Sequence, residues 1–71
     1  MGDTTEGKYA NYFDIGFTRF EILLDFGQFD SDLQKGIRHT RIILNPSSAR
    51  VFLHMLADVM AKYELDVEDK E

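Results

Sequence analysis

The sequence predicts an α+β domain: a three-stranded antiparallel β-meander followed by one C-terminal α-helix that packs on one face of the sheet (βββα). Two patterns carry this prediction. From Phe20 to Phe26, the even positions are large and apolar, while positions 21 and 25 are charged. This period of two is typical of a strand with one buried face. From Ala49 to Tyr63, apolar residues recur at intervals of three and four, which is typical of an amphipathic helix.

Three segments are expected to be strands. The first is Tyr9–Ile15, and Gly16 then marks a hairpin turn. The second is Arg19–Phe29, which contains all of the alternating segment. Asp30, Ser31, Asp32 and Gly36 indicate a loop in which Gly36 is expected to have a positive φ. Arg38–Leu44 is the third strand. Short connections between three such strands favour a meander.

Within the second strand, two residues depart from the simple pattern. Leu23 breaks the alternation and should point away from the face that the helix covers. Gly27 is expected to mark a β-bulge or a close approach of another backbone segment.

The helix has a clear start signal and a continuous apolar stripe. Either Asn45 caps it with Pro46 at the first helical position, or Ser47 caps it one turn later. The stripe consists of Ala49, Phe52, Leu53, Leu56, Val59, Met60 and Tyr63. The charged residues on the opposite side are Arg50, His54, Asp58 and Lys62. One side of the helix is therefore expected to be buried.

The length of 71 residues allows one domain, which we expect to span residues 8–64. Residues 1–7 form a predicted disordered N-terminal tail, and residues 65–71 an acidic C-terminal tail. A domain of this size buries only about 60 % of the surface of its unfolded chain. Small domains are usually reinforced by disulfides, metals or partner subunits, and this sequence has no cysteine. We therefore expect a homodimer or a higher homo-oligomer to complete the fold.

The charge of the chain disfavours two classes of partner. The formal net charge is −5, because 13 acidic residues outnumber 8 basic ones. Nucleic acids and anionic membrane surfaces both require clustered Lys and Arg. No apolar run reaches the length of a bilayer span, and the N-terminus lacks the apolar core of a signal peptide. These features predict a soluble, cytoplasmic protein.

The uncovered face of the sheet is the candidate contact surface for another copy or another protein. The four candidate contact residues are Tyr12, Leu23, Arg41 and Ile43. The alternative is a solvated face with scattered apolar groups, which is common on protein surfaces. The unpaired edges of the first and third strands offer a second route to association, because each presents free backbone groups.

No residue pattern points to catalysis, a metal or a cofactor. The set considered for a metal or for acid–base chemistry is Asp14, Glu21, Asp25 and His39. Glu21 and Asp25 are roughly 13 Å apart along a strand, too far to share one ion. Solvated carboxylates paired with Arg19 or Arg41 are the favoured interpretation. Likewise, Ser47 and Ser48 favour ordinary helix capping over anion binding.

The sequence therefore favours a non-enzymatic, self-associating scaffold module that binds another protein. The alternative is a chaperone-like binder of extended polypeptides, whose architecture would be similar to that of SecB secretion chaperones. Nucleic-acid binding is a weaker third hypothesis. It requires a set of arginines to converge on one patch, namely Arg19, Arg38, Arg41 and Arg50.

Several short motifs together resemble one known family. The N-terminal motifs are Tyr9-Ala10-Asn11-Tyr12-Phe13, Phe20-Glu21 and Leu24-Asp25-Phe26-Gly27-Gln28. Arg41-Ile42, Leu44, Pro46, Ala49, Leu53, Leu56 and Tyr63-Glu64 follow. This pattern resembles small prokaryotic proteins grouped as domain of unknown function 3467, over about residues 9–64. Phe17-Thr18-Arg19 departs from the polar, proline-containing turn of that family. The resemblance implies a single soluble domain but no activity and no functional residues.

Overall fold

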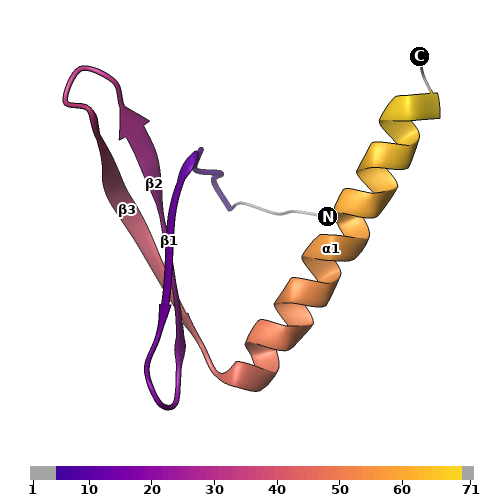
Figure 1. Ribbon diagram of the computed structural model, residues 1–71, viewed down its shortest axis with the longest axis horizontal. Helices are drawn as coiled ribbons and strands as arrows, with labels where there is room; N and C mark the ends of the chain where they lie inside the picture. Colours follow the sequence, from indigo (N-terminus) through magenta and orange to yellow (C-terminus); the bar gives the residue numbers. More distant parts are fainter. Residues whose placement is uncertain (1–4, 70–71) are drawn as a thin grey trace.

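The computed structural model describes residues 5–69, with side chains described up to residue 67. The elements are β1 (Tyr12–Phe17), β2 (Ile22–Asp30), β3 (Lys35–Leu44) and α1 (Pro46–Asp69). The strands form one antiparallel sheet in the order β1-β2-β3, and the helix follows them (Figure 1). The predicted βββα arrangement is therefore confirmed.

Strand pairing gives the sheet one apolar and one polar face. Phe13 of β1 pairs with Phe26 of β2, and Ile15 of β1 pairs with Leu24 of β2. Leu24 also pairs with Ile42 of β3. The apolar sheet face comprises Phe13, Ile15, Phe17, Ile22, Leu24, Phe26, Ile42 and Leu44. The rings of Phe13 and Phe26 meet edge to face, with centroids 5.9 Å apart. Leu23 lies on the opposite face, as its position in the alternation predicts.

A β-bulge interrupts the pairing of β2 with β3. Phe26 pairs with Thr40 and Gly27 with Arg38, so His39 is the extra residue. The backbone of β3 approaches Gly27 so closely that a Cβ there would overlap the carbonyl oxygen of Ile37. The prediction of a bulge or close backbone approach at Gly27 is confirmed, and both occur.

The first hairpin turns later than expected. β1 runs through Gly16 to Phe17, and the turn begins at Thr18. The Thr18 hydroxyl accepts hydrogen bonds from the N–H groups of Phe20 (3.2 Å) and Glu21 (3.1 Å). This threonine closes the turn without help from Gly16. Phe20 consequently lies in the turn and is exposed, so its predicted burial on the second strand is wrong.

The second turn spans residues 31–34 and does not use the expected glycine. Asp30 Oδ1 accepts hydrogen bonds from the N–H groups of Asp32 and Leu33, which forms an Asx turn. The residue with positive φ is Gln34, at 56°. The expectation for Gly36 is therefore wrong. Gly36 belongs to β3, where a Cβ would overlap the ring of Tyr12.

The helix begins where the first of the two capping alternatives places it. The Asn45 side-chain oxygen accepts a hydrogen bond from the Ser48 N–H at 2.7 Å, and Pro46 is the first helical residue. Ser47 is therefore not the cap. The helix continues to Asp69, five residues beyond the Glu64 boundary predicted from the sequence.

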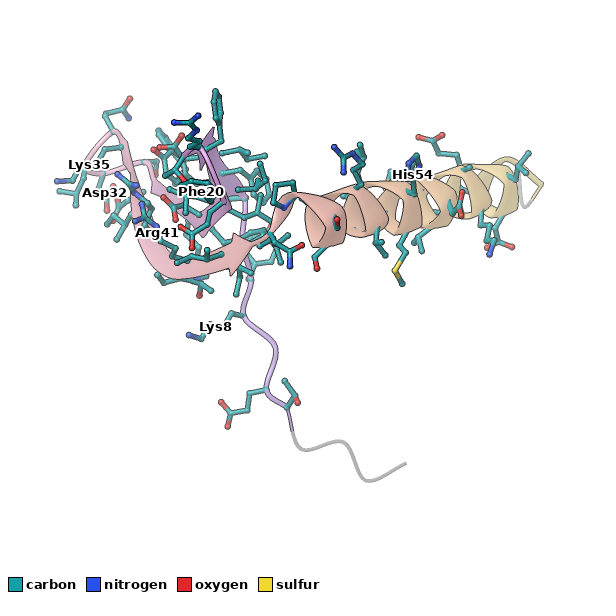
Figure 2. All side chains as sticks on the ribbon, turned by 90° about the horizontal axis from the view of Figure 1, so that it is seen from below. Lys8, Phe20, Asp32, Lys35, Arg41 and His54 are labelled. Carbon is teal, nitrogen blue, oxygen red and sulfur yellow. The ribbon has the colours of Figure 1, made fainter. Side chains whose placement is uncertain are left out.

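The sequence predicts that the helix packs on one face of its own sheet. In the structure, the helix does not lie flat on the apolar sheet face of its own chain. It is close to the sheet only near its start and then diverges, so that sheet and helix form a V (Figure 1). Seen from below, α1 projects well beyond the strands (Figure 2). One residue, Asn45, separates β3 from α1, and Pro46 fixes its own φ. A connection this short leaves little freedom to fold the helix back across the sheet.

A single chain consequently has almost no core. Among residues 5–67, only Leu24, Asp25 and Gly27 are buried, and Leu24 is 8 % exposed. The radius of gyration is 15.4 Å, compared with about 11 Å for a compact domain of 71 residues. The strands and the helix are well formed, but the apolar sheet face and the apolar stripe of α1, which the sequence predicts to be in contact, remain apart.

Candidate interaction surface

An apolar cleft separates the sheet from the helix. The sheet contributes Phe13, Ile15, Leu24 and Phe26, and the helix contributes Phe52 and Leu56. The backbone of Asp25 also lies at this cleft, whose volume is about 310 Å³. Its lining is almost entirely hydrocarbon, so the cleft offers no set of polar groups that would orient a small substrate.

The apolar stripe of α1 extends this surface along the helix. From Phe52 to Tyr63, its residues are between 43 % and 61 % exposed. On the sheet, Phe13 is exposed to a similar degree, and Ile15 and Phe17 are more exposed still, up to 81 %. Contiguous apolar surfaces of this kind mark interaction sites rather than ordinary protein surface.

The exposed area can be compared with that of a compact protein. The chain exposes 6475 Å², whereas a compact monomer of the same mass exposes about 4,500 Å². The difference of about 2,000 Å² exceeds the roughly 800 Å² that each partner buries in a standard interface. Counted over two chains, about 4,000 Å² falls in the range of total buried area that is typical of obligate dimers.

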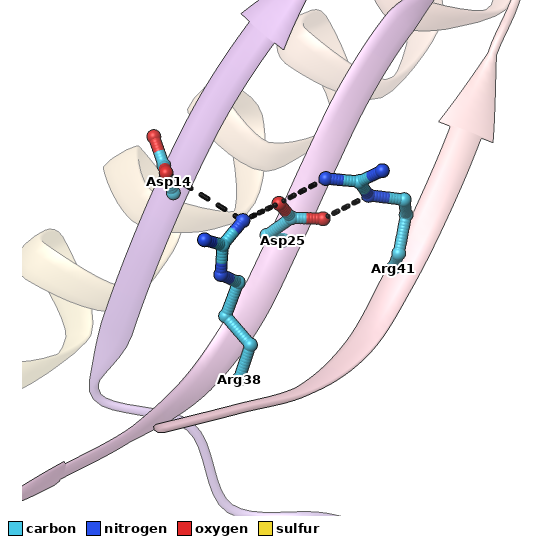
Figure 3. Close-up of polar contacts among 4 residues, drawn as sticks. All are labelled: Asp14, Asp25, Arg38 and Arg41. Carbon is cyan, nitrogen blue, oxygen red and sulfur yellow. Dashed lines mark hydrogen bonds and ion pairs between the residues drawn. The ribbon is translucent and has the colours of Figure 1, made fainter. Parts of the chain in front are cut away.

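The other side of the sheet carries a network of charged residues centred on Asp25. Arg41 binds both carboxylate oxygens, with Nε–Oδ1 at 2.7 Å and Nη2–Oδ2 at 2.9 Å (Figure 3). Arg38 Nη1 donates to Oδ2 at 2.7 Å and lies 3.8 Å from an oxygen of Asp14. Asp25 is only 4 % exposed, while both arginine side chains remain about half exposed. The carboxylate therefore fixes two arginines in a defined orientation.

This arrangement determines the protonation state of Asp25. Hydrogen bonds from Arg41 and Arg38, together with their positive charges, hold the pKa of Asp25 well below its usual range. Burial opposes them by raising the pKa, but its effect is smaller. Asp25 is thus anionic at neutral pH, where it organises the polar face and is poorly suited to exchange protons.

The bulge explains why sequence reasoning identified only part of this network. The predicted pairing of a carboxylate with Arg41 is confirmed for Asp25, but this carboxylate is buried rather than solvated, and the role of Arg38 was missed. Strict alternation in β3 would place Arg38 on the apolar sheet face together with Thr40. The extra residue His39 shifts the register by one, which returns Arg38 to the face of Asp25.

The same shift changes the position of His39 itself. Strict alternation along the predicted strand Arg38–Leu44 would place this side chain on the polar face, beside Arg41. In the structure, its Nδ1 lies 2.7 Å from Thr40 Oγ1, and its Nε2 lies 3.0 Å from the carbonyl oxygen of Tyr9. His39 therefore connects the bulge to the segment before β1. It also belongs to a shallow depression with Phe26, Thr40 and Ile42 on the apolar side.

The four predicted contact residues all lie on the polar face of the sheet. Leu23 and Ile43 are direct cross-strand partners, and Ile43 is 55 % exposed. Arg41 is held beside them by Asp25. Tyr12 pairs with Gly27 further along the sheet, where its ring covers Gly36. They form a mixed surface that is less apolar than the cleft.

The remaining chemical candidates do not come together. In the part of the chain that the structure describes, no group of three or more His, Asp or Glu side chains is arranged to hold a metal ion. Two of the four arginines required for nucleic-acid binding, Arg38 and Arg41, are engaged with Asp25. Over residues 5–69, α1 is the one helix, and it is not apolar enough to cross a membrane.

The pattern of this chain matches one known family over most of its length. A family model described as protein of unknown function (DUF3467) matches residues 2–67. The protein belongs to the DUF3467 family. Searches among curated proteins and among solved structures find no match. Membership in DUF3467 confirms the resemblance noted in the sequence and assigns no activity.

Proposed function

We propose that this protein is a non-enzymatic, self-associating interaction module that works as a homodimer and binds another protein. The apolar cleft between the sheet and α1 is the observation that carries the proposal. Burying such a surface is the main favourable contribution to protein association. A second copy of the same chain is always available as a partner, and it exposes the same apolar surfaces.

The proposed role as a scaffold depends on the polar face of the sheet. Once the apolar sheet face is covered, Tyr12, Leu23, Arg41 and Ile43 remain on the outside of the assembly. Arg41 is already oriented by Asp25 at 2.7 Å, so little side-chain entropy is lost when a partner binds it. This surface suits a folded protein that presents a carboxylate beside an apolar group. The proposal includes a prokaryotic, cytoplasmic setting, with which a chain lacking cysteine is compatible.

Light scattering on two variants tests self-association. We expect the parent protein to have at least twice the 8.2 kDa mass of one chain. Leu56→Asp places a charge in the cleft and should give a monomer or an unfolded chain, because a buried unpaired charge is strongly destabilising. Ala61→Asp adds the same charge to the helix but outside the apolar stripe, and it should keep the parent mass. A parent protein that stays monomeric at high concentration would refute the proposal.

The chaperone-like alternative rests on a different feature. β1 and β3 are both edge strands, so each presents backbone groups that an extended polypeptide can pair with. A reduced and alkylated unfolded protein is a suitable probe. Tight binding of this probe by the intact oligomer would favour the chaperone, whereas the scaffold proposal predicts that the probe does not bind.

A further inference from the structure

We infer that the apolar cleft of each chain is filled by helix α1 of a second copy, so that the two chains exchange helices. This inference rests on the proposed self-association and specifies its geometry. In the resulting dimer, two sheets lie on the outside and two helices lie between them. Each helix then contacts the apolar sheet face of the other chain as well as its fellow helix.

The length of α1 supports this arrangement. Its 24 residues correspond to a rod of about 36 Å at 1.5 Å per residue. Only Phe52 and Leu56, in its first half, line the cleft with the sheet of the same chain. Val59, Met60 and Tyr63 continue the stripe where the helix has diverged from the strands (Figure 1). This second half of the stripe has no sheet of its own chain to cover it, and an uncovered sheet on a second copy matches it.

The distribution of charge is compatible with contact between identical chains. Each chain carries a formal charge of −5, so like charges placed at the contact surface would add to the repulsion between two copies. The apolar stripe and the apolar sheet face contain no charged side chain. Arg50, His54, Asp58 and Lys62 lie on the other side of the helix, and the acidic residues Glu64, Asp66, Glu68 and Asp69 follow the stripe at the C-terminal end. Helix exchange therefore buries hydrocarbon without desolvating a charge.

A second copy is favoured over an unrelated partner because each chain offers both of the surfaces that need to be covered. Each chain offers one exposed helix stripe and one exposed sheet face, so two chains satisfy both surfaces at once. Such a two-fold contact is closed and ends at the dimer. Pairing through the edges of β1 or β3 would leave both apolar surfaces exposed. The excess area of about 2,000 Å² per chain is large enough to supply the interface of an obligate dimer.

Cross-linking between single-cysteine variants tests the inference, because the natural chain contains no cysteine. One chain carries Ile15→Cys on the apolar sheet face. A second, differently tagged chain carries Leu56→Cys, Met60→Cys or Tyr63→Cys on the helix stripe. The two chains are unfolded together, refolded and treated with a short bismaleimide. We expect a cross-linked product that carries both tags, at twice the 8.2 kDa chain mass, for at least one stripe position.

Two controls separate the possible outcomes. Ala61→Cys lies outside the stripe and should give no product with Ile15→Cys. Leu23→Cys and Ile43→Cys, placed in separate chains, report contact through the polar face instead. A dimer in light scattering that cross-links through Leu23 and Ile43, or through no stripe residue, overturns helix exchange but keeps self-association. A monomer in light scattering overturns both.

Discussion

At the scale of single residues, Asp25 organises the polar face through its hydrogen bonds to Arg38 and Arg41. Its neighbour in sequence, Leu24, faces the cleft on the other side of the sheet. These two adjacent residues therefore anchor the two faces of β2. A charged residue in the most protected strand is stable there only because both of its oxygens are paired.

The lowered pKa of Asp25 predicts how stability depends on pH. A carboxyl group whose pKa is lower in the folded state adds stability above its unfolded pKa of about 3.9. That contribution is lost as the pH falls below this value toward the folded-state pKa. We expect urea unfolding to show a free energy that declines steadily as the pH falls below about 4.

Two asparagine variants assign this decline to Asp25. Asp25→Asn should be less stable than the parent at pH 7, because the charge-assisted hydrogen bonds to both arginines are weakened. It should also lose much of the dependence on acid pH. Asp14→Asn is the matched control, since Asp14 is exposed and lies 3.8 Å from Arg38. It should retain the parent pH profile, and equal profiles for parent and Asp25→Asn would contradict the assignment.

The sequence predicts on which face of the sheet a strand side chain lies, except in the part of β3 that precedes the bulge. Alternation places Leu23, Asp25, Arg41 and Ile43 on one face because the side-chain period of a strand is two. Beyond His39 this rule fails, since one inserted residue reverses every side chain that precedes it in β3. Gly27 signals the bulge, but the glycine alone does not identify the extra residue on the opposite strand.

At the scale of elements, Gly27 controls the pairing of β2 with β3. Replacement by Ala would force a Cβ against the backbone of Ile37, and backbone cannot move aside as a flexible side chain does. We expect Gly27→Ala to lower the free energy of unfolding by about 1 to 3 kcal/mol. Gly16→Ala is the control, because a Cβ at Gly16 meets nothing within 4 Å. Its effect should stay within about 0.5 kcal/mol in thermal or urea unfolding.

The helix illustrates what local patterns predict and what they leave open. Spacing and capping residues predict a helix from Pro46 with an apolar stripe, and the structure has it. The same pattern indicates that the stripe must be buried, but not against which surface. The nearest candidate in the sequence is the sheet of the same chain, and only the first half of the stripe, at Phe52 and Leu56, faces that sheet across the cleft. The one-residue connection at Asn45 directs the helix elsewhere, and this consequence depends on three-dimensional geometry.

At the scale of the whole molecule, size and composition by themselves favour a partner. A chain of 71 residues without cysteine cannot rely on disulfides, and oligomerisation is the usual substitute. The open V is compatible with this expectation, because it leaves large apolar side chains exposed on both the sheet and the helix. The surface chosen from the sequence, around Leu23 and Ile43, is better regarded as the outer face of the proposed dimer.

If dimerisation and folding are one process, thermal stability must depend on chain concentration. Each tenfold dilution lowers the unfolding free energy of a two-state dimer by about 1.4 kcal/mol. For an assembly of two 71-residue chains, this corresponds to a decrease in Tm of roughly 3 to 6 °C. Circular dichroism of the helix, over about a hundredfold range of concentration, measures the shift. Ala61→Asp should show the same slope as the parent. A Tm that is high and independent of concentration would mean that a single chain closes its own cleft.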